Sequence, residues 1–90
     1  MSQNAIVDFL DDEFDGLKVD AIRNDASAST TFQVEVDAGA EMLLTIADAC
    51  FNDHSLTDIQ AVIQSHAKSL MKQNHNVVIH LNADLSCSVG

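Results

Sequence analysis

The chain of 90 residues carries 14 acidic and 4 basic side chains, a formal net charge of −10, while 47% of its residues are hydrophobic and its mean hydropathy is +0.06. That apolar content separates it from disordered acidic chains, and its length suits a single domain over residues 1–90 with one modest core. The charge disfavours direct binding to nucleic acid or to an anionic membrane, because cationic side chains hold both.

The first predicted element is an amphipathic helix over residues 4–15, in which apolar side chains recur among five acidic ones at helical spacing. Gly16 is expected to end this helix, because glycine readily adopts the left-handed conformation found just past helix ends. From Asp11 the stretch also resembles the opening of a calcium loop, with oxygen-bearing side chains at alternate positions before Gly16. The match fails at Ile22, where such a loop needs a bidentate carboxylate, so we expect an acidic helix face instead.

Two strands are predicted next, over residues 17–23 and 30–37. The polar stretch 24–29 between them is rich in small side chains, which is typical of a loop. The later strand is the clearer one, because from Phe32 onward apolar side chains alternate with polar ones. One face of this strand is therefore expected to be apolar and the other polar.

A helical hairpin is predicted in the middle of the chain. The strand alternation breaks at residues 38–39, and from Ala40 the apolar side chains recur at helical spacing, so we expect a helix that stops near Asn52. A second helix is predicted from Thr57 as N-cap, with Gln60 reaching back as in a capping box. Its expected buried stripe is Ile59, Val62, Ile63, Ala67, Leu70 and Met71.

The last predicted elements are strands over residues 77–81 and 85–89, which pair antiparallel through a three-residue loop in the register that places Ile79 opposite Cys87. This register makes one face of the pair apolar and puts His80 on the other face. Together the elements predict an α+β fold, in which an antiparallel four-stranded sheet packs on the helical hairpin, with a short amino-terminal helix.

The sequence contains no arrangement typical of catalysis or of a metal centre. Cys50 and His54 lie four residues apart, but no second close pair completes the tetrahedral set that a structural zinc site requires. Cys87 and His80 are expected on opposite faces of their strands, so they cannot share a metal. Glycine-rich loops of the kind that hold phosphates are missing as well. We therefore predict a protein that is not an enzyme and that uses no cofactor and no metal.

The expected compartment is the cytoplasm. No apolar run approaches the roughly 18 residues that span a bilayer, and residues 1–4 lack the basic segment that opens a secretory signal. The chain has only two cysteines, which are too few for a disulfide scaffold and are expected to be buried thiols.

The excess of carboxylates suggests a basic protein as partner. Our leading hypothesis is a small inhibitory or neutralising protein that presents carboxylates to a basic groove of a target, for example a nucleic-acid-binding protein. Nucleic-acid mimics, immunity proteins and anti-defence proteins work in this way. Apolar side chains among the acids would add specificity. The predicted partner-binding residues are Asp8, Phe9, Asp11, Asp12, Glu13, Phe14, Asp15 and Asp20.

Two other functions fit the same sequence. The first alternative is a homo-oligomeric assembly module that uses an apolar surface, for example a homodimer formed through an exposed strand edge or through the amino-terminal helix. In the second it is a precursor or substrate that an enzyme modifies at the carboxy-terminal residues 85–90. Any single carboxylate can also be explained by solubility alone. A net charge of roughly 2 to 8 in magnitude is enough to keep a small domain soluble, however, and this chain exceeds it.

Overall fold

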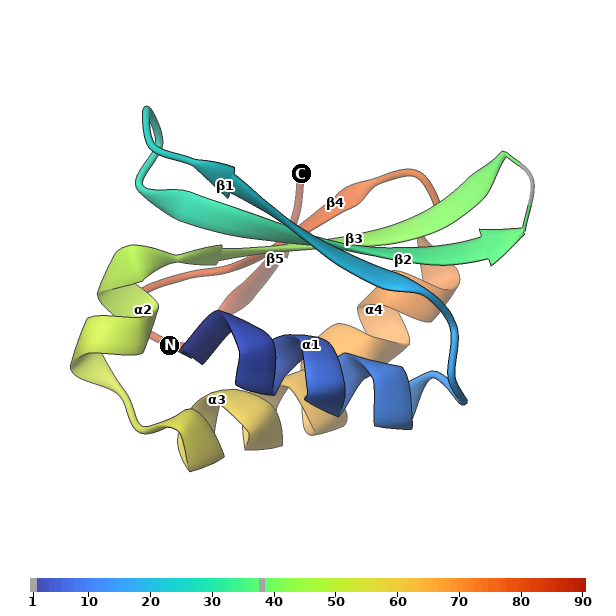
Figure 1. Ribbon diagram of the computed structural model, residues 1–90. Coiled ribbons are helices and arrows are strands. Elements are labelled where there is room, and N and C mark those ends of the chain that lie inside the picture. The colour runs from blue at the N-terminus through green and yellow to red at the C-terminus, as the bar shows by residue number, and fades with distance from the viewer. Residues whose placement is uncertain (1, 38) are drawn as a thin grey trace.

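Two layers make up the fold in the computed structural model, which describes residues 2–37 and 39–90: a five-stranded sheet and a layer of helices on one side of it (Figure 1). The predicted strand break at Ala38 lies outside the described residues. The elements in chain order are α1 (Ser2–Glu13), β1 (Val19–Asn24), β2 (Ser29–Asp37), β3 (Ala40–Ala47), α2 (Asp48–Asp53), α3 (Leu56–Val62), the π-helical segment η1 (Ile63–Ala67), α4 (Lys68–Gln73), β4 (Val78–Leu81) and β5 (Cys87–Val89).

The sheet follows the chain order β1-β2-β3-β4-β5 and is mixed. Neighbouring strands are antiparallel except β3 and β4, which are parallel because the helices between them carry the chain back to the other end of the sheet. The predicted α+β class is confirmed. The predicted four-stranded antiparallel sheet on a helical hairpin is wrong, since the sheet has a fifth strand where the first helix of that hairpin was expected.

The additional strand is β3, and its sequence explains why a helix was predicted there. Met42, Leu44 and Ile46 alternate along it and are at most 2% exposed, as in a strand with one covered face. Leu43 and Ala47 lie on the other face, and their apolar side chains imitate the spacing of a helix. Only the short helix α2 remains of the predicted helix.

One continuous helix, formed by α3, η1 and α4, covers the middle of the sheet. Its N-cap is Ser55, whose Oγ accepts a hydrogen bond from the Asp58 N–H at 3.1 Å, so the predicted cap at Thr57 is wrong by two residues. The buried residues Ile59, Ile63, Ala67 and Met71 follow one another in steps of four.

The π-helical segment η1 keeps this buried stripe on the sheet. Steps of four overshoot a turn of about 3.6 residues, so a purely α-helical stripe would rotate away from the strands. The Lys68 N–H donates to the Ile63 carbonyl oxygen, five residues back, which widens the turn between the two ends of the stripe. The wider turn therefore offsets the rotation.

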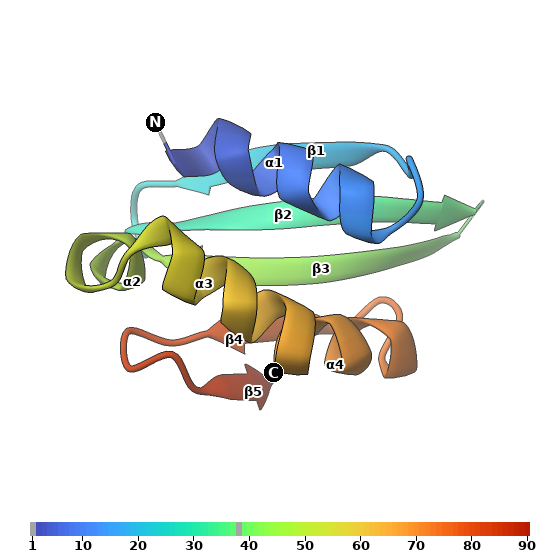
Figure 2. The same ribbon diagram turned by 90° about the horizontal axis from the view of Figure 1, so that it is seen from below.

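The predicted amino-terminal helix is confirmed as α1. Ile6, Leu10 and Phe14 lie one turn apart and are at most 4% exposed, and α1 packs across β1 and β2 while α4 packs across β3 and β4 (Figure 2). The chain leaves the helix through Asp15 at φ 57° and Gly16 at φ 82°, and the Gly16 N–H donates to the Asp11 carbonyl oxygen at 2.8 Å. This is the termination expected of a glycine just past a helix end.

The carboxy-terminal hairpin has the predicted faces but another register. Ile79 pairs with Val89 and Leu81 with Cys87, so the predicted pairing of Ile79 with Cys87 is wrong by two residues. The loop is correspondingly longer than three residues. A shift of two preserves the alternation of side chains, and His80, opposite Ser88, lies on the other face from Cys87 as expected.

Candidate protein-binding surface

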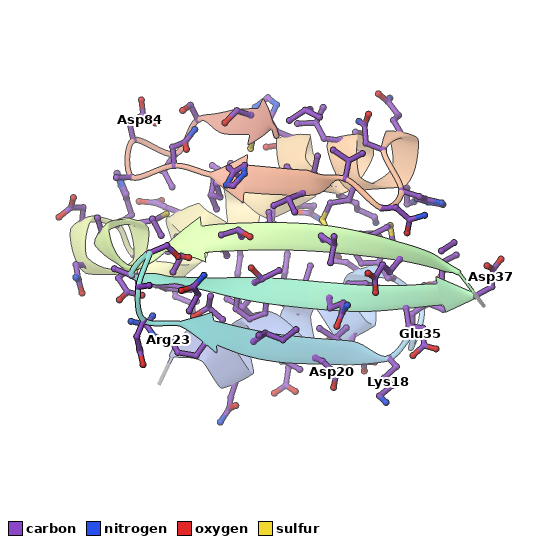
Figure 3. All side chains as sticks on the ribbon, turned by 90° about the horizontal axis from the view of Figure 1, so that it is seen from above. Lys18, Asp20, Arg23, Glu35, Asp37 and Asp84 are labelled. Atoms are coloured by element: carbon purple, nitrogen blue, oxygen red, sulfur yellow. The ribbon has the colours of Figure 1, made fainter. Side chains whose placement is uncertain are left out.

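The helices cover one face of the sheet only, and the outward side chains of the other face are in view in Figure 3. The pairing of the strands places one row of side chains across all five: Ile22, Thr31, Thr45, His80 and Ser88. The hydroxyl oxygens of Thr31 and Thr45 are hydrogen-bonded at 2.7 Å. This row contains neither acidic residues nor lysine or arginine, so the centre of the uncovered face is mostly polar without formal charge.

Carboxylates gather at the end of this face where β2 turns into β3. Four of them, from three different strands, line an open concavity of about 280 Å³ together with Gln33, Gly39, Ala40 and Asn76. Figure 3 shows three of the four at the same end of the strands. We call the set the acidic notch, and its members are Asp20, Glu35, Asp37 and Glu41.

Asn76 ties the loop before β4 to the start of β3 beside the notch. Its side-chain amide donates to the Gly39 carbonyl oxygen at 3.1 Å, and its Oδ1 accepts from the Glu41 N–H at 3.0 Å. Its own N–H donates to the Glu41 carbonyl oxygen at 2.8 Å. Asn76 has a φ of 64°, a conformation that asparagine tolerates better than most residues. These bonds fix the backbone that carries Glu41.

The electrostatics of the notch are unbalanced. Its cationic neighbour is Lys18, whose Nζ lies 3.9 Å from Asp20 Oδ2, and both side chains are more than half exposed, so the pair contributes little. Glu35 and Glu41 face each other directly across β2 and β3. Gln33 donates to Glu41 Oε2 at 2.6 Å, whereas Glu35 has no cationic partner among the residues that the structure describes. Like charges directly opposite each other are unfavourable, and a bound cation would relieve this repulsion.

Most of the predicted partner-binding residues lie on α1, on the other side of the sheet. Asp8, Asp11 and Asp12 are exposed there, as residues of an acidic helix face should be, and Asp15 is exposed in the turn that follows α1. Asp20 alone belongs to the acidic notch. The structure therefore separates Asp20 from the helix acids and brings it together with residues of β2 and β3.

The two predicted aromatic contacts point towards the core. Phe14 is 4% exposed, so it is a core residue and offers no surface to a partner. Phe9 is half-buried and packs against the core cluster. Glu13 is paired with Lys68 at 3.4 Å, and the same ammonium group lies 5.9 Å from the centre of the Phe14 ring. These residues join α1 to α4, which is a structural role.

Three members of the notch were not predicted as site residues. Glu35 and Asp37 fall in a correctly predicted strand, on its polar face, but no sequence pattern brings them next to Asp20. Glu41 was assigned to a helix, which removed it from the sheet altogether. The alternation around Phe32 was the available signal, because it already placed Glu35 on an exposed strand face.

The surroundings of both thiols favour their protonated form. Burial, with smaller contributions from Asp53 and Cys87, raises the pKa of the Cys50 thiol, and burial also raises the pKa of Cys87. Protonated thiols are poor nucleophiles and poor metal ligands. A ring nitrogen of His54 lies 2.6 Å from the Ala83 carbonyl oxygen. Within residues 2–37 and 39–90, no group of three or more histidine, cysteine, aspartate or glutamate side chains is placed to hold a metal ion.

Comparison with models of protein families, with curated proteins and with solved structures found no match. None of the helices in the described segments has the length and apolar character needed to cross a membrane.

Proposed function

We propose that this chain is a small acidic protein-binding module of the inhibitory or neutralising type, which holds a basic surface of a cytoplasmic target protein against the acidic notch. The observation that carries the proposal is the convergence of Asp20, Glu35, Asp37 and Glu41 around one open concavity. Among the residues that the structure describes, the ion pair that this group makes is the weak contact between Asp20 and Lys18. Binding a lysine or arginine side chain there would replace carboxylate repulsion by attraction.

A nucleic-acid-binding protein is the class of target that fits this chemistry best. Its binding groove concentrates positive charge to meet phosphates, and carboxylates at the rim of a sheet offer the same charge. A chain of net charge −10 would be steered to such a groove by long-range attraction, and added salt would screen that attraction. The neutral row of Thr31, Thr45 and Ser88 beside the notch offers hydroxyl groups that could add directional contacts.

Affinity capture from the native host, in low and in high salt, tests the proposal. The bait is the wild-type chain, the notch variant E35Q/D37N, or the control variant D53N/D58N, which removes the same charge from exposed positions on α2 and α3. We expect a basic protein that is captured in low salt and lost in high salt. Its affinity, measured afterwards with the purified partner, should fall about tenfold in the notch variant and change by less than about twofold in the control.

A third bait, D8N/D11N/D12N, tests the acidic face of α1 instead of the notch. If this variant loses the partner and E35Q/D37N keeps it, the binding surface is α1 and the proposed site is wrong. A partner whose affinity is the same in low and high salt would remove the charge-driven function altogether.

A further inference from the structure

β1 is the free edge of the sheet at the side of the notch. It pairs with β2 on one side and stands at one end of the sheet order, so its other side has no neighbouring strand in the sheet. Five of its six residues are exposed, and Ile22 keeps 50% of its surface accessible. The opposite edge strand, β5, has three residues only. Long exposed edges present unpaired backbone groups that can pair with another strand.

The register shows which backbone groups of β1 point outward. The Glu35 N–H donates to the Lys18 carbonyl oxygen at 3.0 Å, so this facing pair is hydrogen-bonded. Hydrogen-bonded and non-hydrogen-bonded pairs alternate along an antiparallel ladder. Every second residue after Lys18 therefore bonds to β2, and the residues between direct their N–H and C=O groups away from the sheet. These outward residues are Val19, Ala21 and Arg23.

Acidic side chains flank this edge on both faces of the sheet. Asp20 lies on the uncovered face of β1, next to the rest of the notch. On the covered face α1 packs against β1 (Figure 2), and the exposed residues of α1 include Asp8 and Asp11. A strand added to the edge would lie about 4.8 Å from β1, which is within reach of Asp20 for a long lysine or arginine side chain.

The charge distinguishes between two occupants of the edge. A second copy of the chain would bring another net charge of −10 to a surface that is already acidic. A basic strand would instead meet the carboxylates of Asp20 and of the rest of the acidic notch. The edge therefore favours a basic partner over self-association.

We propose that β1 receives an extended basic segment of the partner protein as a sixth strand, antiparallel to β1, with lysine or arginine at alternate positions on the uncovered face, directed towards Asp20 and the acidic notch. This inference rests on the proposed function, because the occupant is a segment of the same basic target. It adds the means of holding that segment: backbone hydrogen bonds from Val19, Ala21 and Arg23 give affinity, and the carboxylates select basic side chains.

The probe for the experiment is a labelled peptide of about ten residues in which lysine alternates with threonine, long enough to cover an edge strand. In a strand that is antiparallel to β1 and has its lysines on the uncovered face, the threonines lie opposite Val19, Ala21 and Arg23 and direct their backbone groups at β1. N-methylation of the threonine nitrogens should abolish binding, whereas N-methylation of the lysine nitrogens should leave it within about twofold. The two methylated peptides carry the same charge, so the comparison isolates the backbone bonds.

The matching change in the protein is Ala21→Pro, which removes an outward N–H and leaves the bonds between β1 and β2 in place. We expect it to weaken binding of the unmodified peptide about tenfold, with the circular dichroism spectrum unchanged. If A21P does not fold, binding of the two methylated peptides to the wild-type chain still tests strand addition.

Three results overturn the inference. In the first, the two methylated peptides bind equally well and E35Q/D37N loses binding. This result contradicts strand addition but agrees with the proposed charge-driven function. If E35Q/D37N also binds as the wild type does, the proposed function fails as well. If light scattering finds a dimer of the free chain that A21P dissociates, the occupant of the edge is a second copy and not a basic partner.

Discussion

At the scale of single residues, Arg23 joins the β1–β2 hairpin to the start of α2. Its guanidinium donates to the two carboxylate oxygens of Asp48 at 2.5 and 2.7 Å, and its Nε donates to Asp25 at 2.8 Å. These hydrogen bonds raise the pKa of Arg23, with Asp48 contributing most, and the bond from Arg23 lowers the pKa of Asp48. Because the pair is bidentate and links segments 25 residues apart, it should hold the hairpin more firmly than an ordinary surface ion pair.

We predict that Asp48→Asn lowers the melting temperature at neutral pH and that the gap to the wild type closes in acid. The pKa of Asp48 is lower in the folded chain than its ordinary value of 3.8, so its contribution is complete above that value. It is lost as the pH falls through the lower, folded pKa. Thermal unfolding over a pH series measures this, with Asp53→Asn as the control at an exposed carboxylate. A gap that stays constant in acid would contradict the charge-based explanation.

Asn76 supports a second prediction at this scale. Replacement by alanine removes two side-chain hydrogen bonds and leaves a side chain with a Cβ at a φ of 64°. We expect N76A to lower the free energy of unfolding by about 1–2 kcal/mol. N76G loses the same bonds but tolerates the backbone conformation, so its loss should be the smaller of the two. Denaturant titration of both variants tests this order, and equal losses would show that the positive φ costs nothing.

At the scale of elements, the start of the long helix gives the third prediction. Ser55→Ala removes the acceptor of the Asp58 N–H and should cost about 1 kcal/mol of stability. Thr57 lies inside the first turn and is exposed, so Thr57→Ala should change stability by less than about 0.5 kcal/mol. Denaturant titration distinguishes the two positions. A larger loss of stability for T57A than for S55A would show that Thr57 is the N-cap, as the sequence suggested.

The elements that sequence patterns predicted well are those whose burial agrees with their local periodicity. β2 alternates Phe32 and Val34 with polar residues, and α1 carries its buried residues one turn apart, so both were found. β3 was missed because a strand in the interior of a sheet can carry apolar residues such as Leu43 on both faces. The partner strand that decides between helix and strand there lies far away in sequence.

The acidic notch could not be predicted for a related reason. Its four carboxylates belong to three strands, and only the pairing of β1 with β2 and of β2 with β3 brings them together. With Glu41 placed on a helix, the sequence offered the continuous run of acids around Asp12 as the stronger signal. Charge density along the chain therefore suggested a basic partner, whereas the position of the proposed surface depends on the register of the sheet.

At the scale of the whole molecule, most of the positive charge is already paired with carboxylates of the chain itself. Three of the four cationic side chains contact carboxylates of the same chain: Lys18 with Asp20, Arg23 with Asp25 and Asp48, and Lys68 with Glu13. The helices shield one face of the sheet and leave the notch and the β1 edge on accessible surfaces (Figure 1). A one-sided helical layer thus positions both parts of the proposed binding surface next to each other.

The same arrangement implies that stability and binding respond in opposite directions to charge. Glu35 faces Glu41, so the notch variant E35Q/D37N should melt a few degrees higher than the wild type in low salt, because it relieves repulsion. Added salt should raise the melting temperature of the wild type and remove most of this difference. The same variant should bind the proposed basic partner more weakly, since it has lost two of the charges that would attract that partner. A variant that is neither more stable in low salt nor weaker in binding would mean that these carboxylates act independently of one another.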